Sequence, residues 1–143
     1  MNIQYSLDQF AFPPRRAHAD DAGIDLALNH DASIPVGEHR LCHTGVHVAI
    51  PAGHVGMVFV RSSTGIKKNL VLSNGTGIID AGYTGEIMLS LHNVGRRMQI
   101  VEEGRYVAQL VVVPVPSFEL VQASSLADTE RGSGGIGSTD STA

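Results

Sequence analysis

Glycine and proline interrupt this chain so frequently that long helices are excluded. The 143 residues include 16 Gly and 6 Pro, and no segment of about 12 residues or more has the apolar period of an amphipathic helix. The segments between the interruptions are short and rich in aliphatic side chains. We expect strands at Gly23–Leu28, Gly45–Ile50, Val55–Val60, Leu70–Ser73, Glu86–His92 and Tyr106–Val113. Many short strands separated by turn signals predict an all-β sandwich or barrel.

The chain length fits one domain followed by a tail of different composition. Residues 1–123 contain all the expected strands, which predicts one β domain. Residues 124–143 are dominated by Ser, Thr and Gly and contain almost no large apolar side chains. Such a segment cannot bury enough surface to order itself. We therefore expect a flexible C-terminal arm that either stays solvated or becomes ordered on a ligand or a neighbour.

Charge and cysteine content narrow the classes of partner. Lys and Arg total 10 and Asp and Glu total 14, a net charge of −4, so we expect no nucleic-acid partner. No apolar stretch is long enough to cross a bilayer, and the N-terminus lacks the pattern of a signal peptide. The single cysteine, Cys42, cannot form an internal disulfide. We therefore expect a cytoplasmic protein with no membrane partner.

The segment Gly77–Ile87 is the most informative site candidate. An apolar run delivers one acid, Asp80, and a glycine-flanked turn three residues later presents one aromatic residue, Tyr83. A carboxylate there can take a proton from water, and the ring can pack on a sugar. The alternative is an ordinary turn, since Gly and Asp are common turn residues.

Three other segments have features of an anion-binding site. Arg61 to Gly65 follows a strand and begins an expected helical turn, Ser62–Lys67, so hydroxyls, free N–H groups and a guanidinium converge. The alternative is a simple cap by Ser62 or Ser63. Gln109, inside an apolar strand, could bond the protein or a phosphate. The segment Arg131–Thr139 matches GxGxxG by letter without a βαβ unit, so it is either a phosphate-binding loop or a mobile tail.

Two further patterns concern metal ions. Asp25 lies on a strand between Ile24 and Leu26, either as an exposed acid or as an acid that orients metal-bound waters. His39, His43 and His47 are spaced by four, with Cys42 among them. On a helix they would share a face, but the alternation after Gly45 favours a turn and a strand. We therefore expect no metal site at these histidines.

In this order, the segments resemble the five motifs of the trimeric dUTPase family (dUTP pyrophosphatase), over about Asp21 to Thr139. The resemblance implies a distorted jelly-roll subunit, a homotrimer, and active sites at the subunit interfaces. It implies Mg²⁺-dependent hydrolysis of dUTP to dUMP and pyrophosphate, by attack of water on the α-phosphate. That reaction keeps uracil out of DNA and supplies dUMP for dTMP synthesis.

The resemblance also implies roles for individual residues. Asp80 resembles the residue that activates water, and Asp25 resembles the acid that holds the waters of a Mg²⁺ bound by the triphosphate. Tyr83 resembles the ring that packs on deoxyribose and excludes a 2′-hydroxyl. The full set of implied substrate-binding residues is Arg61, Ser62, Ser63, Gly65, Asn74, Gly77, Ile79, Tyr83, Met88, Gln109, Arg131, Ile136, Gly137 and Ser138.

Two positions depart from the family pattern. The fourth motif usually reads Gly-x-Arg-x-Ala-Gln, and here Tyr106 stands at the Arg position, while Arg105 would point to the opposite face of the strand. The arm usually has an aromatic residue where Ile136 stands. An aliphatic side chain cannot stack on uracil, so we expect weaker closure of the arm.

Three alternative functions stay open at this level. The chain could be a dCTP deaminase or a bifunctional deaminase and dUTPase, which release of ammonia from dCTP would reveal. It could be a nucleotide-gated protein-binding module with secondary catalysis. It could also be a structural trimer without activity, although Asp25, Ser62, Asp80 and Gln109 together favour an enzyme.

Overall fold

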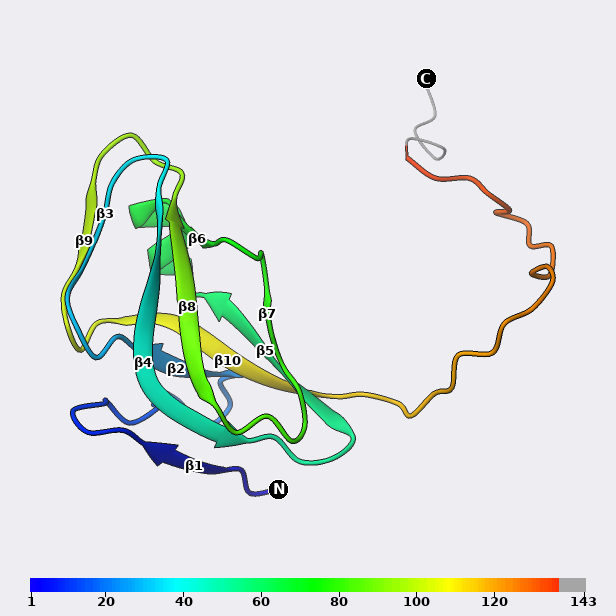
Figure 1. Cartoon of the computed structure of the whole chain (residues 1–143), viewed down its shortest axis with the longest axis horizontal. Coiled ribbons are helices and arrows are strands. Elements are labelled where there is room, and N and C mark those ends of the chain that lie inside the picture. Colours follow the sequence, from blue (N-terminus) through cyan, green and yellow to red (C-terminus); the bar gives the residue numbers. More distant parts are fainter. Residues whose placement is uncertain (137–143) are drawn as a thin grey trace.

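The computed structural model describes residues 1–136 and is built almost entirely from antiparallel strands (Figure 1). One four-stranded sheet has the order β1-β4-β8-β6, a second has the order β2-β10-β5-β7, and β3 and β9 form a separate pair. The elements are β1 (Gln4–Leu7), β2 (Gly23–Ala27), β3 (Ala32–Ile34), β4 (His39–Ala49), β5 (His54–Val60), η1 (Ser63–Lys67), β6 (Leu70–Leu72), β7 (Gly77–Ile79), β8 (Glu86–Asn93), β9 (Gln99–Val101) and β10 (Tyr106–Pro114). The predicted all-β class is confirmed.

The two larger sheets enclose one hydrophobic core. Strand β8 shows how the sequence pattern creates it, because Ile87, Leu89 and Leu91 are buried while the residues between them are not. Leu26 and Leu110 contribute from the opposite sheet and are also buried. The alternation predicted for Glu86–His92 therefore places β8 with one face on the core and one face outward.

Strand β4 is much longer than the predicted strand at Gly45–Ile50. It begins at His39 and contains an irregularity, since its register against β8 shifts between His43 and His47. Gly45 adopts φ +63 at this bulge, a conformation that glycine adopts without steric cost. In the sequence, Gly45 indicates a turn before the strand. In the structure it lies at a bulge within one continuous strand.

Four further strands, β1, β3, β7 and β9, were not among the predicted strands. Strand β1 has only four residues and is exposed at every position, so its short alternation of Tyr5 and Leu7 with polar residues marks no buried face. Strands β3 and β9 have three residues each, too few for a period to be visible. The short helix η1 matches the predicted helical segment. Ser62 stands at the N-cap position, but its side chain makes no capping hydrogen bond, and Ser63 is already the first residue of the helix.

After β10 the chain leaves the body as an extended segment (Figure 1). The backbone N–H of Val115 still donates to Gly53 O at 2.8 Å, and the large apolar side chains beyond it are exposed. They are Phe118, Leu120, Val121, Leu126 and Ile136. No helix among the described residues is long and apolar enough to cross a membrane.

Candidate active site

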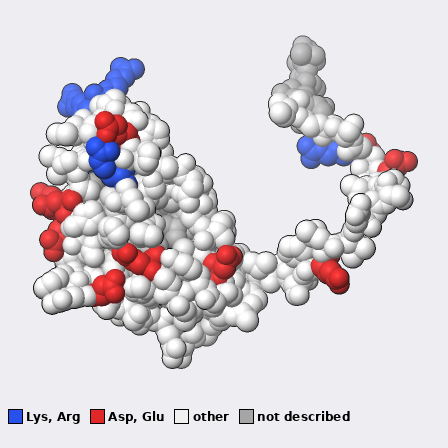
Figure 2. All heavy atoms as spheres, in the orientation of Figure 1, with Lys and Arg blue, Asp and Glu red and all other residues white. Residues whose placement is uncertain are grey.

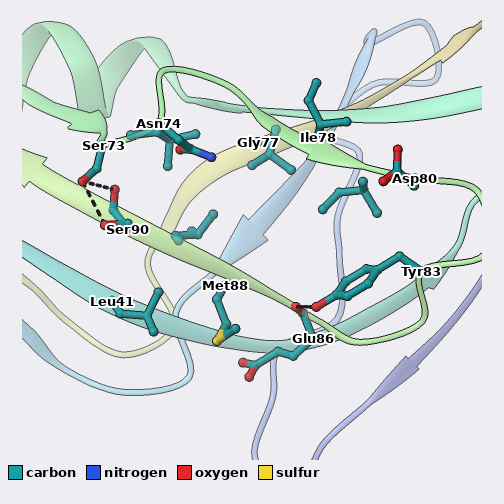
Figure 3. Close-up of a pocket in the computed structure, with 14 residues that line it drawn as sticks. Leu41, Ser73, Asn74, Gly77, Ile78, Asp80, Tyr83, Glu86, Met88 and Ser90 are labelled. Atoms are coloured by element: carbon teal, nitrogen blue, oxygen red, sulfur yellow. Dashed lines mark hydrogen bonds between the residues drawn. The ribbon is translucent and has the colours of Figure 1, made fainter.

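A cavity of about 420 Å³ lies between the β7 strand and the outward face of β8. It is lined by Leu41, Val58, Leu72, Ser73, Asn74, Gly77, Ile78, Ile79, Asp80, Tyr83, Glu86, Met88, Leu89 and Ser90. Figure 3 shows Asp80 and Tyr83 at one end and the paired hydroxyls of Ser73 and Ser90 at the other. Most of the lining between the two ends is aliphatic, which suits a flat organic ring with a polar edge.

Asp80 and Tyr83 share one tight turn at the rim of the cavity. Tyr83 N donates to Asp80 O at 3.1 Å, and Gly82 adopts φ +96 between them. The Tyr83 hydroxyl donates to the backbone oxygen of Glu86 at 2.9 Å, which fixes the ring at the mouth of the cavity. Asp80 is exposed, so its carboxylate is accessible to a water molecule.

The base of this turn is tied to β4 by Glu86. Its Oε1 accepts from Thr44 N at 3.0 Å and from Gly45 N at 2.8 Å, and its Oε2 lies 2.9 Å from His43 Nδ1. Burial alone would raise the pKa of Glu86, but the hydrogen bonds from His43 and the two N–H groups outweigh it and lower the pKa. Glu86 is therefore a fixed acceptor beneath the turn.

Eight residues of the lining were not among the predicted site residues: Leu41, Val58, Leu72, Ser73, Ile78, Glu86, Leu89 and Ser90. Ser90 could have been found, because the period of two on β8 places it on the same face as Met88. Leu41 could not, since the part of β4 before Gly45 was not predicted as strand. Glu86 was missed because a single acidic residue at the start of a strand normally indicates only an exposed position.

A second group of predicted residues gathers on β2, on β10 and at the end of β5. Arg61 Nε lies 3.3 Å from Asp25 Oδ1, and Arg61 also donates to Tyr106 O at 3.2 Å. Gln109 pairs with Asp25 on β2 and with Phe59 on β5. Ser62, Ser63 and Gly65 follow directly at the start of η1. This second group forms a polar cluster with one guanidinium.

The two groups differ in charge and do not share a cavity. The lining of the cavity, as far as the described residues show, includes the acids Asp80 and Glu86 but no Lys or Arg. In Figure 2 the basic side chains of the body gather at the end where β8 connects to β9, with acidic atoms beside them, and further acidic side chains are spread over the rest of this view. Positive charge for an anionic substrate must therefore come from another part of the chain or from another chain.

The described part of the arm, residues 124–136, contributes to neither group. Arg131 closes a local turn, in which its Nε donates to Gly134 O at 3.1 Å and its own carbonyl accepts from Gly134 N at 3.0 Å. Ile136 is fully exposed. The predicted site residues Gly137 and Ser138 lie outside the described residues.

Tyr106 and the histidines have structural contacts of their own. The Tyr106 hydroxyl donates to Pro13 O at 3.0 Å, and the Arg15 guanidinium lies 4.3 Å above its ring. His47 Nδ1 lies 2.9 Å from Thr84 O, and its Nε2 lies 3.2 Å from Asp8 Oδ2. These two contacts raise the pKa of His47, the one to Thr84 most. Within residues 1–136, no three His, Cys, Asp or Glu side chains form a metal cluster.

Comparisons with known proteins identify the family. The dUTPase family model matches residues 10–140. A deoxyuridine 5′-triphosphate nucleotidohydrolase of Mycobacterium marinum is 46% identical over 132 residues, which cover 88% of this chain and 86% of the relative. A mutant dUTPase of Staphylococcus bacteriophage 80alpha, solved with dUpNHpp, superposes with a TM-score of 0.89 at 30% identity, covering 96% of this chain and 97% of the other.

A second solved structure carries a metal ion. A mutant dUTPase from phage phi11 of S. aureus, described with a structural Mg(II) ion, matches with a TM-score of 0.82 at 28% identity, covering 90% of this chain and 100% of the other. These matches confirm the predicted jelly-roll fold and the family resemblance of the motifs. By sequence and by structure, this chain belongs to the dUTPase family.

Proposed function

We propose that this chain hydrolyses dUTP to dUMP and pyrophosphate, with water attacking the α-phosphorus. The observation that carries the proposal is the pairing of Asp80 and Tyr83 on one turn at the mouth of an aliphatic cavity, in a member of the dUTPase family. Asp80 acts as the general base on the attacking water, because its carboxylate is exposed at the rim. The Tyr83 ring packs on the deoxyribose.

The base is read by the β7 edge and Asn74. Strand β7 is the last strand of its sheet and pairs with β5 on one side only. Its other edge therefore offers unpaired backbone N–H and C=O groups, and Gly77, Ile78 and Ile79 line the cavity. These groups and the Asn74 amide match the polar edge of uracil, while Met88 and Leu41 pack beneath the ring.

Selectivity follows from the size of each effect. Excluding thymine depends on one methyl group, worth about 1–3 kcal/mol in a pocket, with steric cost added by a rigid backbone. Binding cytosine would leave buried polar groups of the site unpaired. Each unpaired group costs about as much free energy as the thymine methyl group, or more. Excluding UTP depends on the Tyr83 ring, which leaves no room for a 2′-hydroxyl.

The phosphates of the substrate would be bound by residues of the second group and by Arg131 of the arm. The phosphate-binding residues of the second group are Arg61, Ser62, Ser63, Gly65 and Gln109. Because the cavity lining within residues 1–136 holds no cation, we propose a homotrimer in which the second group and the arm of other chains complete each site. Fixed donors and a guanidinium would then stabilise the charge that develops on the phosphates.

The donor set of the second group fits an outer-sphere Mg²⁺ site. Asp25 is the single carboxylate there, with 14% of its side chain exposed, and it is paired with Arg61. One carboxylate cannot hold Mg²⁺ alone, but Mg²⁺ in nucleotide sites keeps several waters and binds the substrate phosphates. Asp25 would hold those waters. The bound ion would neutralise charge on the triphosphate.

The test is proton release on mixing the purified protein with dUTP, with Mg²⁺ and then with excess EDTA. Parallel runs use dCTP, dTTP and UTP. We expect rapid Mg²⁺-dependent release from dUTP only. Silence with dUTP would overturn the proposal, and ammonia release from dCTP would then identify a deaminase. Binding without turnover would favour a nucleotide-gated binding module or a structural trimer.

A further inference from the structure

The turn that carries Tyr83 is joined to β4 by a side chain with no assigned role. Both carboxylate oxygens of Glu86 are in use, one by Thr44 N and Gly45 N and the other by His43 Nδ1. Only 18% of this side chain is exposed. These N–H groups belong to the β4 bulge, where the register against β8 shifts between His43 and His47. The carboxylate therefore takes the place of the missing ladder bonds.

The orientation of the Tyr83 ring depends on Gly85 and on Glu86, the first residue of β8. Its hydroxyl donates to the backbone oxygen of Glu86 at 2.9 Å (Figure 3). Its ring lies directly on Gly85, so closely that a β-carbon on Gly85 would collide with the phenol. The ring is thus fixed by the backbone at Gly85 and Glu86, and that backbone is fixed by the Glu86 carboxylate.

A second contact holds the same turn from the other side of the bulge. The Thr84 carbonyl lies 2.9 Å from His47 Nδ1. The turn is therefore attached to β4 at two points, through Glu86 and through Thr84. A ring that excludes a hydroxyl by steric overlap must not move by much more than about half an ångström, so such attachment is what this kind of selectivity needs.

We propose that Glu86 is a positioning residue for the discrimination between dUTP and UTP. It acts through Tyr83: by binding the Thr44 and Gly45 N–H groups, its carboxylate fixes the turn so that the ring stays against C2′ of the sugar. The inference rests on the proposed function of Tyr83. Gly85 belongs to the same device, because its missing side chain leaves the space that the ring occupies.

The test measures kcat/KM for dUTP and for UTP in a set of variants, together with each melting temperature. Glu86→Ala is expected to lower the ratio of dUTP to UTP on the order of 10-fold or more, since small displacements of positioning groups have effects of that size. Glu86→Gln keeps an oxygen for the two N–H groups and should recover most of the ratio. Gly85→Ala should lower the ratio with the Glu86 contacts intact.

Glu38→Gln is the matched control, because Glu38 pairs with Arg40 at the exposed start of β4, away from the cavity. It should leave the ratio unchanged. If Tyr83→Ala lowers the ratio but Glu86→Ala and Gly85→Ala do not, the positioning role is wrong while the role of Tyr83 stands. If Tyr83→Ala itself leaves the ratio unchanged, both are wrong. Should Glu86→Ala fail to fold, Glu86→Gln and Gly85→Ala decide the question.

Discussion

Gly23 on β2 leaves the space that the side chain of Gln109 on β10 occupies. A β-carbon at Gly23 would collide with Gln109 Oε1, and it would also lie 3.1 Å from the Gln109 β-carbon. An ordinary side chain at position 23 is therefore incompatible with the present direction of the Gln109 amide. This amide is one of the proposed phosphate ligands.

Gly23→Ala should fold but raise the KM for dUTP several-fold. The collision is with the end of a flexible side chain, so the amide turns away at a cost to stability of about 1–2 kcal/mol. Steady-state kinetics measure the effect. In a Gln109→Ala background, Gly23→Ala should have little additional effect on KM, and an undiminished effect there would show that it does not act through Gln109.

Asp80→Asn should keep nucleotide binding and lose turnover by several orders of magnitude. An amide cannot take the proton of the attacking water, but it has the shape of the carboxylate. Calorimetric titration with a non-hydrolysable dUTP analogue checks nucleotide binding, and measurement of proton release checks turnover. Turnover within about 10-fold of the parent protein would remove Asp80 from the role of base.

Ile136→Phe should tighten dUTP binding. Ile136 is exposed in this structure, and an aromatic ring in its place could stack on the base when the arm closes. The gain should be on the order of 1 kcal/mol, judged from aromatic pair energies. Equilibrium binding measures it, with Ile136→Leu as the control for size without a flat ring. Equal affinities of the Phe and Leu variants would contradict the stacking interpretation.

The stability of the fold should decrease as the pH rises through the folded-state pKa of His47. That pKa lies above its usual value of 6.5, first because of the Thr84 carbonyl and then because of Asp8. The protonated ring therefore stabilises the folded state fully below about pH 6.5, and this stabilisation disappears above the raised pKa. Glu86, whose pKa is lowered, stays ionised throughout this range.

Urea unfolding between pH 6 and 9 tests this expectation, with pH values chosen to bracket the His47 titration. His47→Gln should flatten the profile in that window. His18→Gln, at an exposed position, should leave it as it is. A profile for His47→Gln that coincides with the parent protein would exclude this histidine as the source.

Asn93→Ala should destabilise the fold by about 2–4 kcal/mol, because buried polar groups lose their partners. Its buried amide donates to Ile34 O at 2.9 Å and to Arg97 O at 2.8 Å, and it accepts from Gly95 N at 2.9 Å. Urea unfolding measures the change, with exposed Asn2→Ala as the control. A loss below about 1 kcal/mol would mean that water replaces these bonds.

The sequence predicts those structural features that depend on residues close together in the chain, and it does not predict those that depend on distant residues. The β8 alternation and the Asp80 to Tyr83 turn lie within a few residues and were predicted correctly. The length of β4 was not, because Gly45 has the properties of a turn residue until Glu86 is seen to satisfy the bulge. The role of Glu86 requires knowing that residues 41 or more positions away lie next to it, which no local pattern contains.

The site residues follow the same rule. Asp25, Arg61 and Gln109 each had an ordinary structural explanation, and their proximity appears only when β2, β5 and β10 pair. Their separation from the cavity was not predicted: the family resemblance implied only that active sites lie at subunit interfaces. Neither charge nor spacing in the sequence shows which residues of one chain lie far apart.

In the proposed function, the turn, the second group and the arm would give each chain three separable contributions to catalysis. In the proposed trimer, a chain that lacks one contribution still offers the other two to its neighbours. Asp80→Asn and Arg61→Ala chains, each inactive alone, would form some complete sites when unfolded together and refolded as mixed trimers. Two variants that are inactive alone would then complement each other in mixed trimers. Activity would be a property of the assembly and not of the individual chain.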